Sequence, residues 1–418
     1  MAYPCTFKMT GQTHALAMPQ ANRKSEEDSM INISRRHFIG AVGATAAASA
    51  FSMPAIASGK TIRIGAVQPF SGGLELFGNQ AKMGLDLAAA EINAAGGILG
   101  HQVEILYEDN KTDPKTSVER AKKLIERDEV AAISGPITSA ARDAMAATME
   151  RGKTPLFYAT NYEGGICNRY LFSFNTVPNQ DTAPLIPYLK DIGVGDSYYM
   201  FGADYVWPRN MFATAKNIIG EIGGTTLGEE YTPFGVKDFA PIIRKIADSG
   251  AKVLLFALPG ADGITFIKQA EEFGLTKTVK IAFLGFAETY LGAFGEGKGE
   301  DMYCGVPFVA SSDEPGVQDF VSRIRKTNGD DAVVSFYVMT HYNSVMALKA
   351  GLEKAGKVDR EAMIDAMGGL TFDIPTGPAT ITEADHHIAM NMYIAKTENG
   401  TLNVAKKLGI IEPAPQCG

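Results

Sequence analysis

The chain has 418 residues, 45% of them hydrophobic and 21% charged, which suits a globular protein with room for two hydrophobic cores. The formal net charge is −8 and no run of Lys or Arg interrupts the sequence, which argues against nucleic acid as a partner. The four cysteines show no CxxC or Cys/His spacing, so the sequence predicts no metal site. If the protein is exported, a disulfide between Cys167 and Cys304 is an open alternative.

The N-terminal region has the features of an export signal. Residues 34–40 read SRRHFIG, a mildly apolar stretch rich in Ala and Gly follows, and Ala55-Ile56-Ala57 forms a small-x-small cleavage site. This order is typical of a twin-arginine secretory signal, and the apolar run is too short for the alternative, a transmembrane anchor. We therefore expect residues 1–57 to be a non-mature extension with a signal. The mature protein is expected to be periplasmic and without stable membrane insertion.

Strand and helix patterns alternate from residue 61 onward. Apolar runs and period-two alternation predict strands at 61–70, 101–109, 130–135 and 154–160. Helical spacing predicts helices at 81–97, 114–128 and 139–152. This alternation predicts a parallel sheet with helices on both faces.

The same alternation restarts in the second half of the chain. It predicts strands at 197–204, 225–234, 251–258 and 279–286, and helices at 209–222, 238–250 and 262–274. Two further helices, 316–329 and 337–356, and hairpin-like strands over 375–404 follow. The predicted fold is α/β, with two doubly wound parallel-sheet lobes joined by a hinge. Lobe one would take 58–180 plus 310–375, and lobe two 181–309 plus 376–410, with a ligand cleft at the carboxyl ends of the strands.

The segment GADYVWPRN, residues 202–210, holds the only Trp of the chain. Tyr205 and Trp207 alternate along what reads as an extended piece, so both are expected to face the cleft and to desolvate a small ligand. Packing in the core or between the lobes is the alternative. Asp204 and Arg209 are expected to form a structural pair. Phe77, on the first loop, is a weaker candidate for the opposing wall.

Two stretches carry a resemblance to a known family. IGAVQPFSGGLELFG and AAAEINAAGGILGHQVEILYEDNKTDP resemble the opening of type I periplasmic solute-binding proteins, the branched-chain amino acid receptors of ABC transporters, and the resemblance covers 61–405. TNYEGG (160–165) and GADYVWPR (202–209) look most like the subgroup that binds urea and short-chain amides. The resemblance implies a type I periplasmic binding protein fold.

The resemblance also implies site residues. In such receptors a Ser and a Thr of lobe one hold the polar end of the ligand, and the matching residues are Ser139 and Thr160, with Tyr158 two positions before the Thr. Aromatic residues close over the ligand from lobe two, and Tyr205 and Trp207 match. From sequence alone, a helix cap for the Ser, a turn for the Thr and core packing for Tyr158 stay open as alternatives.

One acidic residue bears on the identity of the ligand. In amino acid receptors of the family an acid after a lobe-two strand takes the ammonium group, and Glu288 in LGFAETY falls at that place; a surface helix cap is the alternative. The chain departs from the amide binders at Ile137, where they carry an aromatic, and at Asn161, where Pro is common. The sequence leaves urea, short amides, amino acids and aromatic acids open.

The function implied by the resemblance is binding without catalysis. The sequence contains no nucleophile elbow, P-loop or GxGxxG motif, so no enzyme activity and no cofactor are expected. The protein would capture a small polar solute, either urea or a short amide or an amino acid, between its lobes and deliver it to an ABC transporter permease. A branched-chain or other amino acid receptor is one alternative. An amide sensor controlling expression is another, against which the export signal argues.

Overall fold

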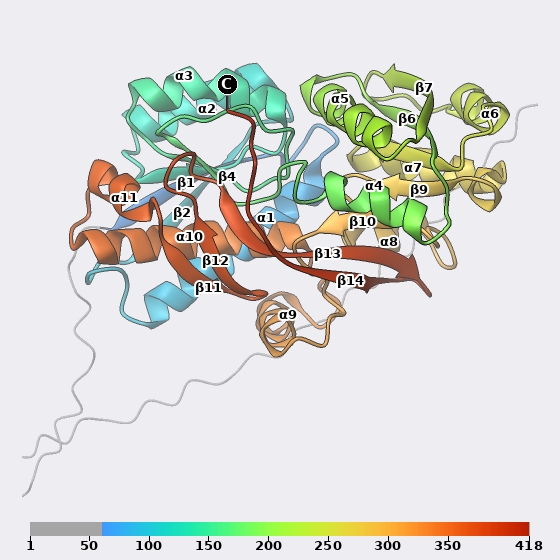
Figure 1. Cartoon of the computed structure of the whole chain (residues 1–418). Coiled ribbons are helices and arrows are strands. Elements are labelled where there is room, and N and C mark those ends of the chain that lie inside the picture. The colour runs from blue at the N-terminus through green and yellow to red at the C-terminus, as the bar shows by residue number, and fades with distance from the viewer. Residues whose placement is uncertain (1–60, 418) are drawn as a thin grey trace, which may run out of the picture. The chain divides into compact units, whose positions relative to one another are not determined.

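The structure is a computed structural model that describes residues 61–417 (Figure 1). The predicted signal, its extension and Cys5 lie outside these residues. The described residues belong to one compact unit, which is built around two sheets. In the part of the chain that the structure describes, no helix combines the length and the apolar character needed to span a bilayer.

The first lobe contains a five-stranded sheet with the order β2-β1-β3-β4-β5, and all its pairings are parallel. Its strands are β1 (Ile62–Gln68), β2 (Val103–Asp109), β3 (Ala132–Ser134), β4 (Leu156–Tyr158) and β5 (Leu171–Ser173). Its helices are α1 (Glu75–Ala94), α2 (Pro114–Glu126), α3 (Ser139–Arg151), α9 (Pro315–Asn328), α10 (Phe336–Ala355) and α11 (Arg360–Met367). Helix α1 packs against α9 and α10, and α2 packs against α3.

The helix starts of this lobe follow from local sequence. The side chain of Asp113 accepts a hydrogen bond from Thr116 N, and Pro114 occupies the first turn of α2. Thr138 caps α3 in the same way by accepting from Ala141 N. Such residues satisfy N–H groups that a helix end leaves unpaired.

The second lobe contains a larger mixed sheet with the order β11-β12-β13-β10-β9-β8-β6-β7, in which β14 also pairs with β13. Its strands are β6 (Ser197–Ala203), β7 (Thr225–Thr232), β8 (Val253–Ala257), β9 (Lys280–Phe283), β10 (Tyr303–Val306), β11 (Thr371–Ile374), β12 (Gly377–Ile381), β13 (Ile388–Glu398) and β14 (Thr401–Ile411). Its helices are α4 (Thr182–Asp191), α5 (Val206–Glu221), α6 (Ala240–Asp248), α7 (Gly260–Glu272), the short 3-10 turn η1 (Leu275–Lys277) and α8 (Thr289–Phe294). Strands β7, β6, β8, β9 and β10 are parallel, whereas β13 runs antiparallel to β10.

The chain passes between the two lobes more than once. It leaves the first sheet after β5 and returns to the first lobe after β10. The return is seen in α9 and α10, which pack on α1. Strand β13 then joins the regions, since His387, the residue before it, bridges to Ser173 of β5 and the strand pairs with β10 further along. The boundary predicted after residue 375 falls in the turn between β11 and β12, and the residue limits of the lobes stay a prediction.

The α/β class with two lobes of parallel sheet is confirmed, and most predicted strands are found within two residues of their expected ends. The prediction that residues 205–207 are extended holds only for Tyr205 and is wrong for Val206 and Trp207, because α5 begins at Val206. The cysteine alternative is wrong as well. Cys167 is bonded to Cys417, and Cys304 is free and buried in β10.

The tail after β14 explains the observed disulfide. The tail returns to the first lobe, where Pro415 O accepts from Gly165 N at 2.5 Å. Asn179 Oδ1 accepts from Ala414 N at 2.8 Å, and Asn179 Nδ2 donates to Glu412 O at 2.8 Å. These bonds bring Cys417 next to the loop that carries Cys167.

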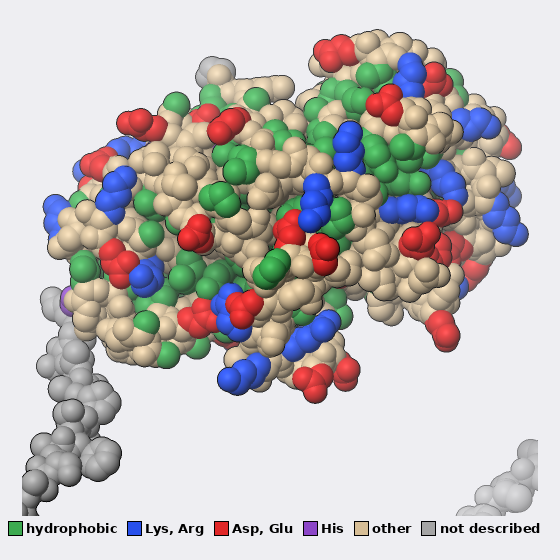
Figure 2. All heavy atoms as spheres, turned by 60° about the horizontal axis from the view of Figure 1, so that its bottom comes forward, with side chains coloured by type: hydrophobic (Ala, Val, Ile, Leu, Met, Phe, Trp, Pro, Cys, Tyr) green, Lys and Arg blue, Asp and Glu red, His purple; other side chains and the backbone are tan. Residues whose placement is uncertain are grey.

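On the face shown in Figure 2, acidic and basic side chains are interspersed without a large patch of one sign.

Candidate functional site

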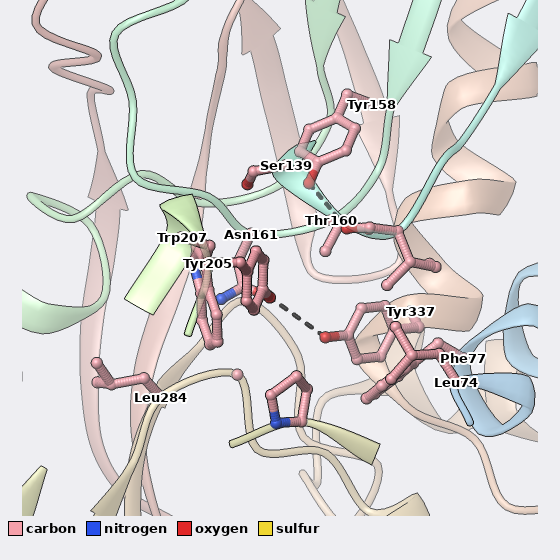
Figure 3. A pocket seen from close by; sticks show the side chains of 13 residues that line it. Leu74, Phe77, Ser139, Tyr158, Thr160, Asn161, Tyr205, Trp207, Leu284 and Tyr337 are labelled. Carbon is pink, nitrogen blue, oxygen red and sulfur yellow. Dashed lines mark hydrogen bonds between the residues drawn. The ribbon is translucent and has the colours of Figure 1, made fainter. Parts of the chain in front are cut away.

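A small cavity lies where loops from the two sheets meet (Figure 3). Its empty volume is about 360 Å³, including space open to solvent. The lining residues follow the carboxyl ends of β1, β3, β4, β6, β8 and β9 or begin α10, as expected for ligand sites of open parallel sheets. They are Leu74, Phe77, Ile137, Ser139, Tyr158, Thr160, Asn161, Tyr205, Trp207, Pro259, Leu284, Gly285 and Tyr337.

Six of the seven residues predicted for the site line this cavity. They are Phe77, Ser139, Tyr158, Thr160, Tyr205 and Trp207. The seventh, Glu288, does not. Its Oε1 accepts from Ala310 N at 2.8 Å, which ties the side chain to the segment after β10. Its Oε2 atom is buried without a hydrogen-bond partner among the described residues, and burial raises the pKa of Glu288 to about 7. The structure does not bring Glu288 into this cavity, and its role as a ligand residue stays a prediction.

Ser139 is held by a buried charged pair behind the cavity. It is the first residue of α3, and Thr138 rather than Ser139 caps that helix. The Oγ atom of Ser139 donates to Glu163 Oε2 at 2.7 Å. Arg142 Nη2 donates to Glu163 Oε1 at 2.9 Å, and Arg142 Nη1 donates to Ser139 Oγ at 3.3 Å. The side chains of Arg142 and Glu163 are only 1% and 3% exposed, so this pair is shielded from solvent.

The guanidinium of Arg142 has further partners that keep it charged. It lies over the rings of Tyr158 and Tyr162, 4.9 and 4.4 Å from their centroids, and it bonds Asp143 Oδ1 at 2.9 Å. Burial by itself disfavours the charged form, but Tyr158, Glu163 and Asp143 outweigh that effect and raise the pKa of Arg142. A buried charge needs such partners.

The hydroxyls next to Ser139 differ in how they are satisfied. Tyr158 donates to Ile137 O at 2.8 Å, and burial raises the pKa of its phenol. Thr160 is buried, and its Oγ1 has no hydrogen-bond partner among the described residues. Asn161 Oδ1 accepts from Tyr337 OH at 3.4 Å (Figure 3). Thr160 is therefore the lobe-one hydroxyl that is left to pair with a solute.

The lobe-two wall carries two aromatic side chains, Tyr205 and Trp207, beside Pro259, Leu284 and Gly285. The ring centroids of Tyr205 and Trp207 are 6.2 Å apart, and Tyr205 is the residue before α5 while Trp207 lies in its first turn. The buried Trp207 Nε1 finds no acceptor in residues 61–417. Burial raises the pKa of Tyr205 far above its ordinary value. The predicted pair of Asp204 and Arg209 is confirmed by a 2.6 Å bond on the surface.

Tyr337 and Asn161 are lining residues with polar side chains that were not predicted for the site. The other unpredicted lining residues are Leu74, Ile137, Pro259, Leu284 and Gly285. The ring of Tyr337 lies 4.8 Å from that of Phe77, centroid to centroid. The sequence does contain a local signal, since Ser335 caps α10 and places two aromatic residues at the start of that helix. Asn161 directly follows Thr160 and was noted only as a departure from the family pattern.

Comparison with known proteins identifies the family of this chain. Residues 61–401 match the periplasmic binding protein family. The chain is 28% identical to Leu/Ile/Val-binding protein homolog 6 of Brucella melitensis over 378 residues, which cover 86% of this chain and 94% of that protein. A solute-binding protein of an R. palustris ABC transporter, solved in complex with 4-hydroxybenzoate, is 26% identical with a TM-score of 0.76, covering 85% of this chain and 98% of that one.

A third comparison concerns the fold alone. The branched-chain amino acid transporter substrate-binding protein LivJ of Streptococcus pneumoniae, solved with isoleucine, is 22% identical with a TM-score of 0.74, covering 85% of this chain and all of that one. The chain therefore belongs to the periplasmic binding protein family, as a type I solute-binding protein of the ABC-transporter class. Membership implies a small-molecule solute, an ABC transporter as partner and an extracytoplasmic location.

Proposed function

We propose that the protein binds a small uncharged planar solute of the amide or urea class and delivers it to an ABC importer without changing it chemically. The observation that carries this proposal is the chemistry of the cavity wall. Among the described residues that line it, none is Asp, Glu, Lys, Arg or His. A charged solute would lose its hydration on entering this cavity, and no side chain of opposite charge would replace it. Moving an unpaired charge out of water is costly.

The absence of a carboxylate in the wall bears most directly on amino acids. An α-ammonium group needs an anionic or several carbonyl partners when it is desolvated. Glu288 does not line the cavity, and Glu163 is occupied by Ser139 and Arg142. The wall therefore supports a solute that carries no ammonium group.

The polar groups that remain suit a carbonyl compound. Thr160 Oγ1 and Trp207 Nε1 are buried donors without partners, and both line the cavity. A solute carbonyl oxygen that accepted from either group would remove the cost of leaving it unsatisfied. The rings of Tyr205 and Trp207 would cover the flat face of the solute.

An aromatic carboxylic acid is the second candidate. The aromatic wall favours it, and so do two relatives at 26% and 25% identity that were solved with 4-hydroxybenzoate and p-hydroxybenzoic acid. The missing cation in the wall argues against it. Matched amides and acids of the same shape separate the two candidates.

A thermal-shift screen of the purified protein tests the proposal. The panel contains urea, formamide, acetamide, benzamide, 4-hydroxybenzoate, leucine and serine, because a ligand that binds the folded form raises the melting temperature. We expect shifts with amides or urea and none with the amino acids. A shift with leucine or serine alone contradicts the proposal, and one with 4-hydroxybenzoate alone selects the second candidate. Mass spectrometry of the recovered solute is expected to show no turnover.

We further propose that export uses the twin-arginine route. The support is the order SRRHFIG, apolar stretch and Ala-Ile-Ala in residues 34–57. Changing Arg35 and Arg36 together to Lys is expected to keep the protein out of the periplasmic fraction. Unchanged export of that variant contradicts this route but leaves the solute proposal untouched.

A further inference from the structure

We infer that Glu163, which does not line the cavity, sets the hydrogen-bond direction of Ser139 and thereby selects solutes that present an N–H group there. This inference rests on the proposed function and names the group that discriminates an amide from the acid of the same shape. Glu163 is a positioning residue in this scheme, since it acts on the solute only through Ser139.

The first step is the position of the Ser139 proton. A hydroxyl has one proton and two lone pairs. A carboxylate that is paired with a guanidinium can only accept, so the 2.7 Å bond between Ser139 Oγ and Glu163 Oε2 must carry the Ser139 proton. Arg142 can only donate, so its 3.3 Å contact to Ser139 Oγ uses one lone pair. One lone pair is left, and Ser139 faces the cavity as an acceptor.

The neighbouring hydroxyl has the same polarity. Tyr158 OH lies 2.8 Å from Ile137 O, and a carbonyl oxygen only accepts, so the phenol proton is also directed into the protein. Figure 3 shows Ser139 and Tyr158 together at one side of the cavity. That side therefore offers lone pairs, which attract an amide N–H and repel the oxygens of a carboxylate.

The buried pair makes this polarity stable. The side chains of Glu163 and Arg142 are only 3% and 1% exposed, and breaking a buried ion pair costs several times more than breaking a surface pair. The proton of Ser139 cannot turn toward the cavity without leaving Glu163 Oε2 short of a partner. The direction is thus determined before the solute arrives.

Glu163→Gln tests the inference because Arg142 dictates how the new amide must point. Arg142 Nη2 needs an acceptor, so the Gln carbonyl oxygen faces Arg142 and the Gln NH₂ group faces Ser139. Ser139 then accepts from Gln, and its own proton is released toward the cavity. The variant reverses the polarity of Ser139 while it leaves the cavity lining unchanged.

The measurement is the ratio of dissociation constants within two isosteric pairs, acetamide with acetate and 4-hydroxybenzamide with 4-hydroxybenzoate. Wild type is expected to prefer the amide, and Glu163→Gln is expected to lower that preference by about tenfold, the factor that one hydrogen bond commonly carries. Asp143→Asn is the matched control. It removes another carboxylate partner of Arg142 but leaves the bond from Ser139 to Glu163, so its ratio should equal that of wild type.

Ser139→Ala provides a second route if Glu163→Gln does not fold. Loss of an acceptor is expected to weaken the amide and to leave the acid unchanged or tighter. Weaker binding of the acid with unchanged amide binding would mean that Ser139 donates, which overturns the inference. If wild type binds amides and the ratio is the same in Glu163→Gln, the inference fails alone. If wild type prefers the acids or binds neither class, the proposed function fails with it.

Discussion

The two walls of the cavity are built on different principles. The lobe-one wall around Ser139 and Tyr158 is polar, and its hydroxyl protons are bonded to Glu163 and to Ile137 O inside the protein. The lobe-two wall of Tyr205 and Trp207 is aromatic, and its buried N–H group has no protein partner in the described chain. Ser139 and Tyr158 in the first wall are therefore organised in advance, whereas Trp207 in the second wall, like Thr160 in the first, finds a polar partner only in a solute.

This difference separates stability from affinity. Changes behind the lobe-one wall disturb a buried network and should act mainly on folding. Changes in the lobe-two wall remove contact area and a donor, and they should act mainly on binding. The variants below are ordered from the largest expected effect to the smallest.

Removing the carboxylate of the buried pair should have the largest effect. Glu163→Ala leaves the guanidinium of Arg142 with only Asp143 as an anionic partner, and we expect the free energy of unfolding to fall by about 3–5 kcal/mol. Chemical denaturation measures this. The control is Glu361→Ala, which breaks the exposed pair with Arg169 and should cost less than about 1 kcal/mol. An equal fall in the free energy of unfolding in the two variants would show that the buried pair stabilises the fold no more than an exposed pair does.

The disulfide should stabilise the loop that follows β4 in the same lobe. It joins residues 250 positions apart in sequence and holds the tail against the loop that carries Asn161 and Glu163. The double change of Cys167 and Cys417 to Ser should lower the free energy of unfolding by about 2–4 kcal/mol. Reductant should destabilise wild type by the same amount and leave the double variant unaffected. A double variant as stable as wild type would contradict the assigned bond.

Trp207 should matter for affinity more than for folding. Trp207→Ala is expected to weaken binding of the solute by about 1–3 kcal/mol, because a buried aromatic contact is lost. Trp207→Phe retains the ring face and loses the N–H group, so we expect about 1 kcal/mol. Isothermal titration with the solute found in the screen measures both. If the Trp207→Phe variant binds the solute as weakly as Trp207→Ala, the N–H group contributes more to affinity than the ring. Unchanged affinity in both variants removes Trp207 from the site.

Glu288 should affect the pH dependence of stability and leave affinity unchanged. Its pKa is raised from an ordinary 4.5 to about 7 by burial, so between these values the unfolded chain has released the proton and the folded chain keeps it. The folded state therefore loses stability as pH rises through this window, by at most about 1.4 kcal/mol per pH unit. Glu288→Gln should flatten the curve from pH 4.5 to 7.

The comparison with wild type isolates this group. Asp181, whose pKa burial raises to about 6, and His341, whose pKa burial lowers to about 4, titrate in both proteins and cancel in the difference. A difference that does not vary with pH would contradict the assignment. A loss of solute affinity in Glu288→Gln would return Glu288 to the site.

Much of the fold was predictable because periodicity is a local property. The alternation of buried strands and amphipathic helices located β1 to β4 and β6 to β9 without any knowledge of tertiary contacts. Strand β5 is as short as β3 and β4, but no helix separates it from β4, so it falls outside the alternation of strands and helices. Helix α8 has only six residues, too few to show a helical period. The path of β13 between the lobes depends on contacts far apart in sequence, which periodicity does not report.

The site was predictable where it follows strand ends and less so elsewhere. Ser139, Tyr158 and Thr160 come directly after strands or at their ends, where parallel sheets place ligands. The prediction placed Trp207 in the correct wall but in an extended segment. The error arose because α5 begins at Val206 without a polar capping side chain that would signal its start. Tyr337 comes from a helix start about 180 residues after Tyr158, by the numbering. The partner of Ser139, Glu163, stands in the TNYEGG stretch, but nothing local reveals that its side chain turns back to α3.

The single Trp allows the most direct test that this cavity holds the solute. Trp207 is the only Trp of the chain and lines the cavity, so its fluorescence reports on that wall alone. Titration of wild type with acetamide and urea is predicted to give a saturable change in emission whose midpoint equals the dissociation constant from calorimetry. Saturable binding by calorimetry without any change in Trp207 emission would place the solute elsewhere and contradict the assignment of the site.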